Sequence, residues 1–409
     1  MIKVLIIGAV WPEPRSSAAG GHMMQLISLF DKTSYQLTFA SSSTTSENAV
    51  ALSDHGIDEV EIELNDSSFD DFIQNLDPQV VIFDRFISEE QFGWRVLEKC
   101  PKALRVLNTE DLHGLRKARE LAFNNEEEIT TKHLLNDISK REIASIFRSD
   151  LSLIISEFEM ELLLSTFKVE KNLLFYLPFL VDHIDEPNIE DLPTFEKRLH
   201  FVTIGNFLHK PNLDAVSLLK HEIWPLIHKA IPKSEMHIYG AYMPEKLKQW
   251  HDPRSNFYMK GFAENVDDVM RNAKVCLAPL RFGAGLKGKL VDAMISGTPC
   301  VTTTIGAEGL SGNLDMNGII TDDVNAFARM AVELYENQEL WKEKQRNGFK
   351  IINKRFQKRN FQNDFISTMN SLLNNIDDHR TQNVIGTLFH HHSMQSTKYL
   401  SKWIEEKNK

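Results

Sequence analysis

One segment of the chain concentrates glycines and basic side chains at the predicted start of a helix. The segment is PLRFGAGLKGKLVDAM, residues 279–294, in which the glycines are Gly283, Gly285 and Gly288 and the cations are Arg281, Lys287 and Lys289. Glycines let a ligand approach the backbone closely, and the free N–H groups and macrodipole of a helix N-terminus attract anions. Lysines in a first helical turn oppose the macrodipole, so a purely structural role explains them poorly. The pattern predicts a site for a diphosphate.

A second glycine-containing segment precedes a helical pattern near the N-terminus. In WPEPRSSAAGGHMMQL, residues 11–26, Gly20 and Gly21 stand directly before the apolar periodicity. They could open another helix N-terminus to an anion, and a flexible loop at a helix start is the plain alternative. The dinucleotide pattern G-x-G-x-x-G is absent, because only Gly8 follows the first predicted strand. The sequence therefore lacks the main motif expected of a nicotinamide-dependent dehydrogenase.

Weaker candidates follow other predicted strands. Ligands of open parallel sheets collect at the carboxyl ends of the strands, so polar residues at these positions are candidates for binding or catalysis. An Asp/His pair without a visible nucleophile or metal framework is more often a structural unit than a catalytic one. Asp292, one turn after Lys289, could accept hydrogen bonds from ribose hydroxyls or could be structural. The other candidates are Asp84 and Arg85, then Glu110, Asp111 and His113, then Gly205 and Asn206, and Glu308.

These residues depend for their positions on a predicted alternation of short strands and longer helices, which is typical of parallel sheets covered by helices on both faces. The alternation occurs twice, and a segment rich in Asp, Glu and Pro, residues 181–197, interrupts it. We therefore expect an N-terminal domain over 1–190, a C-terminal domain over 191–375 and a tail over 376–409. Strands are expected at 3–7, 36–40, 60–62, 80–84, 105–108, 151–155 and 173–176, then at 199–204, 236–239, 257–259, 275–278, 300–303 and 318–321, with helices over 325–375.

Two local patterns in the first half give more specific expectations. Ser156 and Glu159 have the spacing of a capping box, which predicts a helix start directly after a strand. Residues 112–123, LHGLRKARELAF, mix three basic residues with apolar ones. We expect a packed helix with a solvated basic edge there, and contact with an anionic membrane surface is the alternative.

The tail carries an apolar pattern and a histidine cluster. Leu400, Trp403 and Ile404 recur at helical spacing, so we expect a helix that packs this stripe on one of the domains. The three histidines at 390–392 have no Cys or carboxylate framework around them, and a solvated turn without metal is expected.

The composition excludes several classes of protein. At 42% hydrophobic and 25% charged residues, the 409-residue chain lies in the range of globular proteins. Its longest apolar run has nine residues, far short of the roughly 18 that span a bilayer. Residues 1–195 carry 17 Lys and Arg against 34 Asp and Glu, and residues 196–409 carry 29 against 23; with no basic stripe, nucleic-acid binding is not expected. Cys100, Cys276 and Cys300 are widely spaced, which suggests neither disulfides nor metal and fits a reducing cytoplasm.

Residues 201–310 resemble the donor-binding domain of glycosyltransferases with the GT-B fold, of the group 1 or GT4-like family. FVTIGNFLHKPNLDA, residues 201–215, resembles the family's strand, glycine-containing loop and PN-x-D-A helix start. PLRFGAGLKGKLVDAM and GTPCVTTTIGAEGL, within residues 279–310, are similar to the family's blocks PLR-x-G-x-G-x-x-x-K-x-x-E-A-M and G-x-P-V-V-x-T followed by G-A-E-G-L. The combination of blocks in this order is specific.

The resemblance implies an α/β fold of GT-B architecture, with two Rossmann-like doubly wound parallel-sheet domains facing a central cleft. It implies that Lys289 and Arg281 lie near the donor diphosphate and that Asp292 takes the place of a ribose-binding Glu. The earlier Glu of the family's E-x7-E pattern falls at Ala284, so that sugar contact is missing or supplied elsewhere. The catalytic residues are expected to be Lys289, Arg281, His113 and Asp111, and the donor-binding residues Gly20, Gly21, Gly205, Asn206, Gly283, Gly285, Lys287, Asp292 and Glu308.

We therefore expect a GT4-like hexosyltransferase that moves a sugar from a nucleotide-diphosphate sugar to a glycan, lipid-linked or cell-envelope acceptor, with retention and without metal or other cofactor. The departing diphosphate gains negative charge that the cations and the helix N-terminus can stabilise. A sugar-nucleotide epimerase and a non-catalytic partner subunit that binds nucleotide sugars remain open as alternatives. The expected location is the cytoplasm, with or without peripheral contact at the inner face of the membrane. The sequence leaves the base, sugar, acceptor and oligomeric state open.

Overall fold

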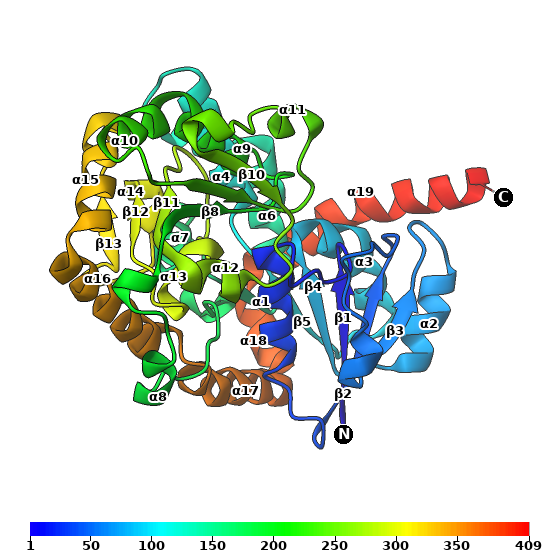
Figure 1. Ribbon diagram of the computed structural model, residues 1–409. Helices are drawn as coiled ribbons and strands as arrows, with labels where there is room; N and C mark the ends of the chain where they lie inside the picture. Colours follow the sequence, from blue (N-terminus) through cyan, green and yellow to red (C-terminus); the bar gives the residue numbers. More distant parts are fainter. Residues whose placement is uncertain (409) are drawn as a thin grey trace.

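The chain forms two parallel α/β domains, which Figure 1 shows on the right and left of the molecule. A computed structural model describes residues 1–408, apart from the side chain at position 393. The first sheet has the order β3-β2-β1-β4-β5-β6-β7 and the second β10-β9-β8-β11-β12-β13. In each sheet the strand order reverses beside the first strand of the domain, where ligands of such sheets bind. The strands are β1 Ile2–Gly8, β2 Tyr35–Ser41, β3 Asp58–Glu61, β4 Val80–Asp84, β5 Leu104–Asn108, β6 Leu151–Ile154, β7 Leu174–Tyr176, β8 His200–Ile204, β9 Met236–Tyr239, β10 Phe257–Gly261, β11 Ala273–Ala278, β12 Cys300–Thr302 and β13 Gly318–Ile320.

Helices cover both faces of the sheets, because the central strands are apolar on both sides. Val80 and Ile82 of β4 pack into the apolar cluster on one face, and Val81 and Phe83 pack into the cluster on the other. Such near-continuous apolar runs are typical of parallel strands. The helices are α1 Ala18–Ile27, α2 Ser68–Leu76, α3 Arg85–Lys99, α4 His113–Asn124, α5 Thr131–Leu134, α6 Asp137–Arg148, α7 Glu157–Ser165, α8 Glu186–Glu190, α9 Lys210–Leu218, α10 Trp224–Ala230, α11 Glu245–Lys248, α12 Val266–Asn272, α13 Gly288–Ile295, α14 Thr304–Ala307, α15 Val324–Glu336, α16 Gln338–Ile351, α17 Arg359–Asn374, α18 Ile376–Gln382 and α19 Val384–Asn408.

The expected strand pattern is confirmed. Every strand predicted from the sequence is present, with ends that differ by at most two residues. The helical prediction for residues 325–375 is met by α15, α16 and α17. The doubly wound α/β fold is therefore confirmed for both halves of the chain.

Helix α17, which lies in the C-terminal domain expected from the sequence, packs on the first domain. Phe365 and Met369 of α17 are buried in the same apolar cluster as β1 and β2. The sequence assigned these residues to the C-terminal domain because they follow its helices without a break. Their apolar side chains, four residues apart on one face of α17, instead complete the core of the first sheet.

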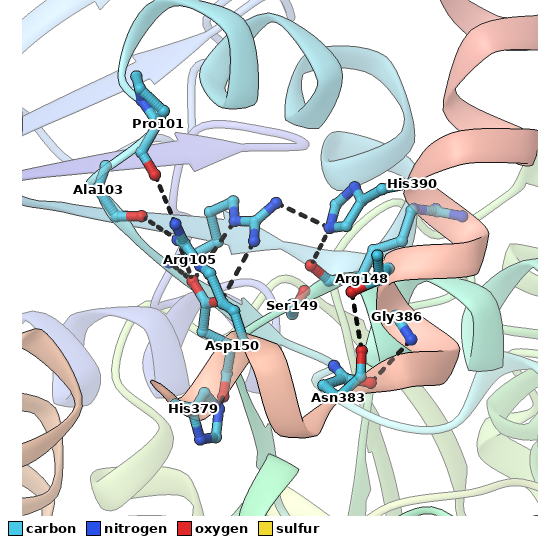
Figure 2. Close-up of polar contacts among 12 residues, drawn as sticks. Pro101, Ala103, Arg105, Arg148, Ser149, Asp150, His379, Asn383, Gly386 and His390 are labelled. Carbon is cyan, nitrogen blue, oxygen red and sulfur yellow. Dashed lines mark hydrogen bonds and ion pairs between the residues drawn. The ribbon is translucent and has the colours of Figure 1, made fainter. Parts of the chain in front are cut away.

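A buried charge cluster ties the following helices to the first domain, and Figure 2 shows its centre. Asp150, before β6, accepts hydrogen bonds from the backbone N–H of Arg105 at 2.8 Å and from its guanidinium at 3.2 Å. Arg380 of α18 donates to both oxygens of the same carboxylate at 2.7 Å. Asn383, between α18 and α19, donates to the carbonyl of Phe147 at 2.8 Å. We call the set Arg105, Asp150 and Arg380 the C-terminal clasp.

The last helix, α19, packs with a different face from the one the sequence indicated. Met394 and Ser401 are buried against the first domain, whereas Leu400 and Trp403 are 57% and 60% exposed. The predicted helix is confirmed, but the predicted packing stripe is wrong, because the face that carries Met394 and Ser401 packs against α3 and α6 instead. The three histidines at 390–392 lie in this helix, so the predicted turn is wrong. His391 and His392 are exposed as expected, whereas His390 contacts Arg105.

Candidate active site between the domains

A cavity of about 290 Å³ lies between the domains, at the carboxyl ends of both sheets. The first domain contributes the loop before α1 and the loop after β5. The second domain contributes the loops after β8, β9 and β11 and the first turn of α13. The expected central cleft between the two sheets is therefore present, and α1 lies between the sheets in Figure 1.

The N-termini of α1 and α13 meet at this cavity. A Cβ atom added to Gly288 would lie 2.7 Å from the Cβ of Ala18, so the two helices approach this closely only because residue 288 is glycine. Ser17 caps α1 by accepting from the N–H of Gly20 at 3.0 Å, whereas no side chain caps α13. Two positive helix ends from different domains thus face one space, an arrangement that an anion between them stabilises.

Lys287 and Lys289 add two cations to the same wall. Lys289 Nζ donates to Asn212 Oδ1 at 2.8 Å, and Lys287 Nζ donates to the carbonyls of Ala284 and Gly285 at 3.1 and 2.6 Å. Neither lysine forms an ion pair with a carboxylate among the described residues. Burial lowers the pKa of Lys287 and that of Lys289 to about 8. An anionic ligand would restore their full protonation.

The remainder of the second-domain wall suits hydroxyls and an apolar ring. Asp292 lines the cavity, and burial together with Asp267 raises its pKa to about 7, so its carboxyl group can both accept and donate near neutral pH. Phe262 and Val266 supply apolar surface. Of the other residues expected at the donor, Gly21, Gly205, Asn206, Gly283 and Gly285 also line the cavity.

The first-domain wall carries carboxylates held by a basic residue. Arg116 Nη1 donates to both oxygens of Asp111, at 3.0 and 2.7 Å. Burial opposes ionisation of Asp111, but Arg116 and His113 outweigh it and lower the pKa. Glu110 accepts a hydrogen bond from Asn108 at 2.7 Å and has a positive φ of 62°. The sequence placed Asp111 here but missed Arg116, whose only local signal was its position one turn after His113.

Four residues expected in the site do not line the cavity: Arg281, Glu308, His113 and Gly20. The guanidinium of Arg281 pairs with Asp214, with 2.9 Å between Nε and Oδ2, and lies over the ring of Phe123. His113 contacts the carbonyl of Asp111 at 3.0 Å, and Gly20 packs against the backbone of Glu13. Arg281 therefore forms an ion pair with Asp214 and does not line the cavity.

Helix α4 packs between the domains rather than presenting a solvated basic edge. Arg119, 6% exposed, donates to the carbonyl of Gly283 at 2.8 Å and to Glu308 at 2.9 and 2.6 Å. Phe123 stacks on Phe282 with 5.4 Å between ring centroids. The predicted packed helix is confirmed, and the predicted solvated edge is wrong because the second domain covers it.

The predicted helix start after β6 is confirmed, because α7 begins at Glu157, but the capping box itself does not form. Ser156 is the N-cap residue, but its side chain makes no capping hydrogen bond. Glu159 turns away from it, and its Oε1 accepts from the backbone N–H of Leu112 at 3.0 Å and of Gly285 at 2.8 Å. Tertiary partners therefore outcompete the local cap.

Within residues 1–408, no group of three or more His, Cys, Asp or Glu side chains is placed to hold a metal ion. Metal independence stays a prediction. The three cysteines are buried free thiols. No helix in the described part of the chain combines the length and apolar character that crossing a bilayer requires.

Comparison with known proteins agrees with this geometry. Residues 198–337 match the family described as Glycosyl transferases group 1. The matched residues lie within the second domain, from β8 to the start of α16. The cavity wall with Lys287, Lys289 and Asp292 lies within the matched residues.

Three known proteins are similar to the whole or most of the chain. The "Uncharacterized 44.6 kDa protein in cps region" of Klebsiella pneumoniae is 24% identical over 292 residues, 67% of this chain and 71% of that protein. Anabaena Alr3699/HepE, solved in complex with UDP and glucose, has a TM-score of 0.69 at 12% identity, over 91% of this chain and 100% of that one. A mutant of S. aureus TarM, solved in complex with Fondaparinux, alpha-GlcNAc-glycerol and UDP, has a TM-score of 0.58 at 17% identity, over 74% of this chain and 58% of that one.

Coverage and sequence identity determine what these two similarities show. This chain spans less than two thirds of TarM. At identities of 12% and 17% this similarity shows the fold, which is the two-domain GT-B fold. It does not show the substrate. The expected GT-B architecture is therefore confirmed for the chain as a whole.

Proposed function

We propose that this protein transfers a sugar from a UDP-sugar to a hydroxyl group of an acceptor that lies against the first domain. The observation that carries the proposal is the pair of facing helix N-termini, at Ala18 and Gly288, beside two lysines without carboxylate partners. A diphosphate carries two adjacent negatively charged groups, which would balance the positive charge of the two helix N-termini and the two lysines. UDP is the nucleotide proposed because it is bound in the solved structures of HepE and TarM.

The reaction follows from where charge develops. When the bond between the anomeric carbon and the diphosphate oxygen breaks, negative charge grows on the departing UDP. Lys287, Lys289 and the two helix N-termini stabilise that charge without a proton transfer. We propose retention of the anomeric configuration, with the leaving phosphate oxygen taking the proton of the acceptor hydroxyl, and no requirement for a metal ion.

The first-domain wall is proposed to hold the acceptor. Asp111 and Glu110 are acceptors for hydroxyl groups, and Arg116 fixes the carboxylate of Asp111. A cell-envelope glycan or its precursor is the proposed acceptor class. The support is the cps region named for the Klebsiella relative and the alpha-GlcNAc-glycerol bound to TarM.

Nucleotide sugars should stabilise the protein in a thermal-unfolding screen. We expect UDP and UDP-sugars to raise the Tm by mass action, and GDP-, dTDP- and ADP-sugars to raise it less. Product analysis then separates the reactions. UDP released only when an acceptor is present indicates transfer, whereas interconversion of two sugar nucleotides indicates epimerisation. Binding without either product, across a broad acceptor panel, would favour a non-catalytic subunit.

UDP affinity should fall as pH rises from 7 to 9. Lys287 and Lys289 lose their protons around pH 8 in the free protein because burial lowers the pKa of each to about 8. The diphosphate raises these pKa values, so binding above pH 8 takes up protons, and affinity drops about tenfold over this range for each lysine whose charge is required. Calorimetry in buffers of different ionisation enthalpy measures both quantities. A pH-independent affinity would contradict the assignment of the lysines.

A further inference from the structure

A single loop of the second domain is held by the first domain at two points. This loop, residues 283–287, is called the donor loop here. Its Gly283 carbonyl accepts from Arg119 Nη1 at 2.8 Å, and its Gly285 N–H donates to Glu159 Oε1 at 2.8 Å. Gly283 and Gly285 have positive φ values of 141° and 64°, so the loop has a backbone form that depends on glycine and on these contacts.

Glu159 links the donor loop to the acceptor wall as well. The same Oε1 atom accepts from Leu112 N–H at 3.0 Å, in the loop that carries Asp111. Gly285 lies so close to this loop that an added Cβ would be 2.8 Å from the Cβ of Asp111. One buried carboxyl group therefore fixes the separation between the loop that presents Lys287 and the loop that presents Asp111.

Burial sets the charge of this carboxyl group. Glu159 is fully buried, and its Oε2 has no hydrogen-bond partner among the described residues. Burial, reinforced by Asp111, raises the pKa of Glu159 to about 8. At neutral pH the group is mostly uncharged, so it can accept two backbone N–H groups without repelling a diphosphate next to the donor loop.

We propose that Glu159 is a positioning residue that couples donor binding to domain closure: it holds the donor loop in its anion-binding form only while the two domains are closed. This inference rests on the proposed function and names the regulation of the same site. Binding of a diphosphate to Lys287 and the α13 N-terminus stabilises the donor loop, and through Glu159 it also orders the loop around Leu112. The acceptor wall is thereby completed only when the donor is present.

The test uses the full chain, UDP as the probe, calorimetry for affinity and hydrogen exchange of the segments 283–288 and 109–115. In the wild type, UDP protects both segments. Glu159→Ala should weaken UDP binding about tenfold, the loss of one buried hydrogen bond. It should also speed exchange of 283–288 without nucleotide and remove the UDP-dependent protection of 109–115. Glu159→Gln, whose amide oxygen can accept the same two bonds, should restore most of both effects.

The matched control is Glu142→Ala. Glu142 is also buried and accepts two backbone N–H groups, from His113 at 2.9 Å and Gly114 at 3.0 Å, but within residues 1–408 it forms no hydrogen bond or ion pair with the second domain. This variant should lower the Tm and leave UDP affinity within about twofold, because no donor-loop contact is lost. Equal loss of UDP affinity in the two alanine variants would overturn the proposal, as would wild-type affinity and exchange in Glu159→Ala.

The outcomes also separate this inference from the proposed function. If the wild type binds no nucleotide, the proposed function fails and the proposed coupling fails with it. This holds even if hydrogen exchange measured without nucleotide shows that Glu159 stabilises the donor loop. If UDP binds and Glu159→Ala has no effect, only the coupling fails. Should Glu159→Ala not fold, Arg119→Ala releases the other end of the donor loop and is read by the same two measurements.

Discussion

Lys289→Ala is expected to weaken UDP binding by about 30-fold or more and to abolish the stabilisation by UDP in a thermal-unfolding assay. Removing one partner of a buried charged contact costs about 2–5 kcal/mol, and 2 kcal/mol corresponds to about 30-fold. Lys289 lies in the first turn of α13, lines the cavity and forms no ion pair with a carboxylate in the described part of the chain. Its charge is therefore available to the diphosphate.

The variant should fold at least as well as the wild type. Burial lowers the pKa of Lys289 to about 8, so the folded protein bears a cost for keeping this lysine charged at neutral pH. Alanine removes that cost and is expected to leave the Tm without nucleotide unchanged or raised. Lys229→Ala, on the exposed surface of α10, is the control and should bind UDP like the wild type. Unchanged UDP affinity in Lys289→Ala would refute the diphosphate site.

The second large effect is expected in the C-terminal clasp, far from the cavity. Asp150→Ala removes a 2% exposed carboxylate and leaves Arg105 and Arg380 without their shared partner. Breaking a buried pair in this way costs about 3–5 kcal/mol, which corresponds to a Tm lower by about 10 °C for a domain of this size. Differential scanning calorimetry measures the shift and shows whether the first domain unfolds separately.

An exposed ion pair in the same region provides the control. Lys102 and Asp377 are both 73% exposed, so Lys102→Ala should change the Tm very little. Saturating UDP should still raise the Tm of Asp150→Ala, because the cavity does not contain the clasp. A Tm equal to that of the wild type would mean that the ion pairs of Asp150 contribute nothing to the stability of the first domain.

The clasp also predicts a pH dependence. Burial opposes ionisation of Asp150, but Arg105 and Arg380 outweigh it and hold the pKa of this carboxyl group well below its ordinary value of 3.8. A carboxyl group whose folded pKa is depressed contributes stability above its unfolded pKa and loses it as the pH falls. The Tm difference between wild type and Asp150→Ala should therefore be constant from pH 8 to 5 and shrink below about pH 4.

Local sequence patterns determined the elements of this protein and one wall of its site. Short apolar runs rich in β-forming residues predicted all thirteen strands of the described chain, because backbone preference and burial on both faces act over a few residues. The glycines and lysines around α13 were predicted for the same reason. A helix N-terminus and its first-turn side chains are adjacent in the sequence, so their shared chemistry can be read without knowing the fold.

Only the tertiary structure decided which polar groups pair across the chain. Arg281 was expected at the diphosphate, but Asp214, 67 residues away, holds it. Glu308 pairs with Arg119 across 189 residues, and Glu159 leaves its local cap for Gly285, 126 residues further on. The face of α19 that packs was likewise set by α3 and α6 rather than by its apolar stripe. A buried polar side chain pairs with whichever polar group the folded chain brings next to it. Those neighbours are determined by the packing of distant segments and of the two domains, which local sequence does not specify.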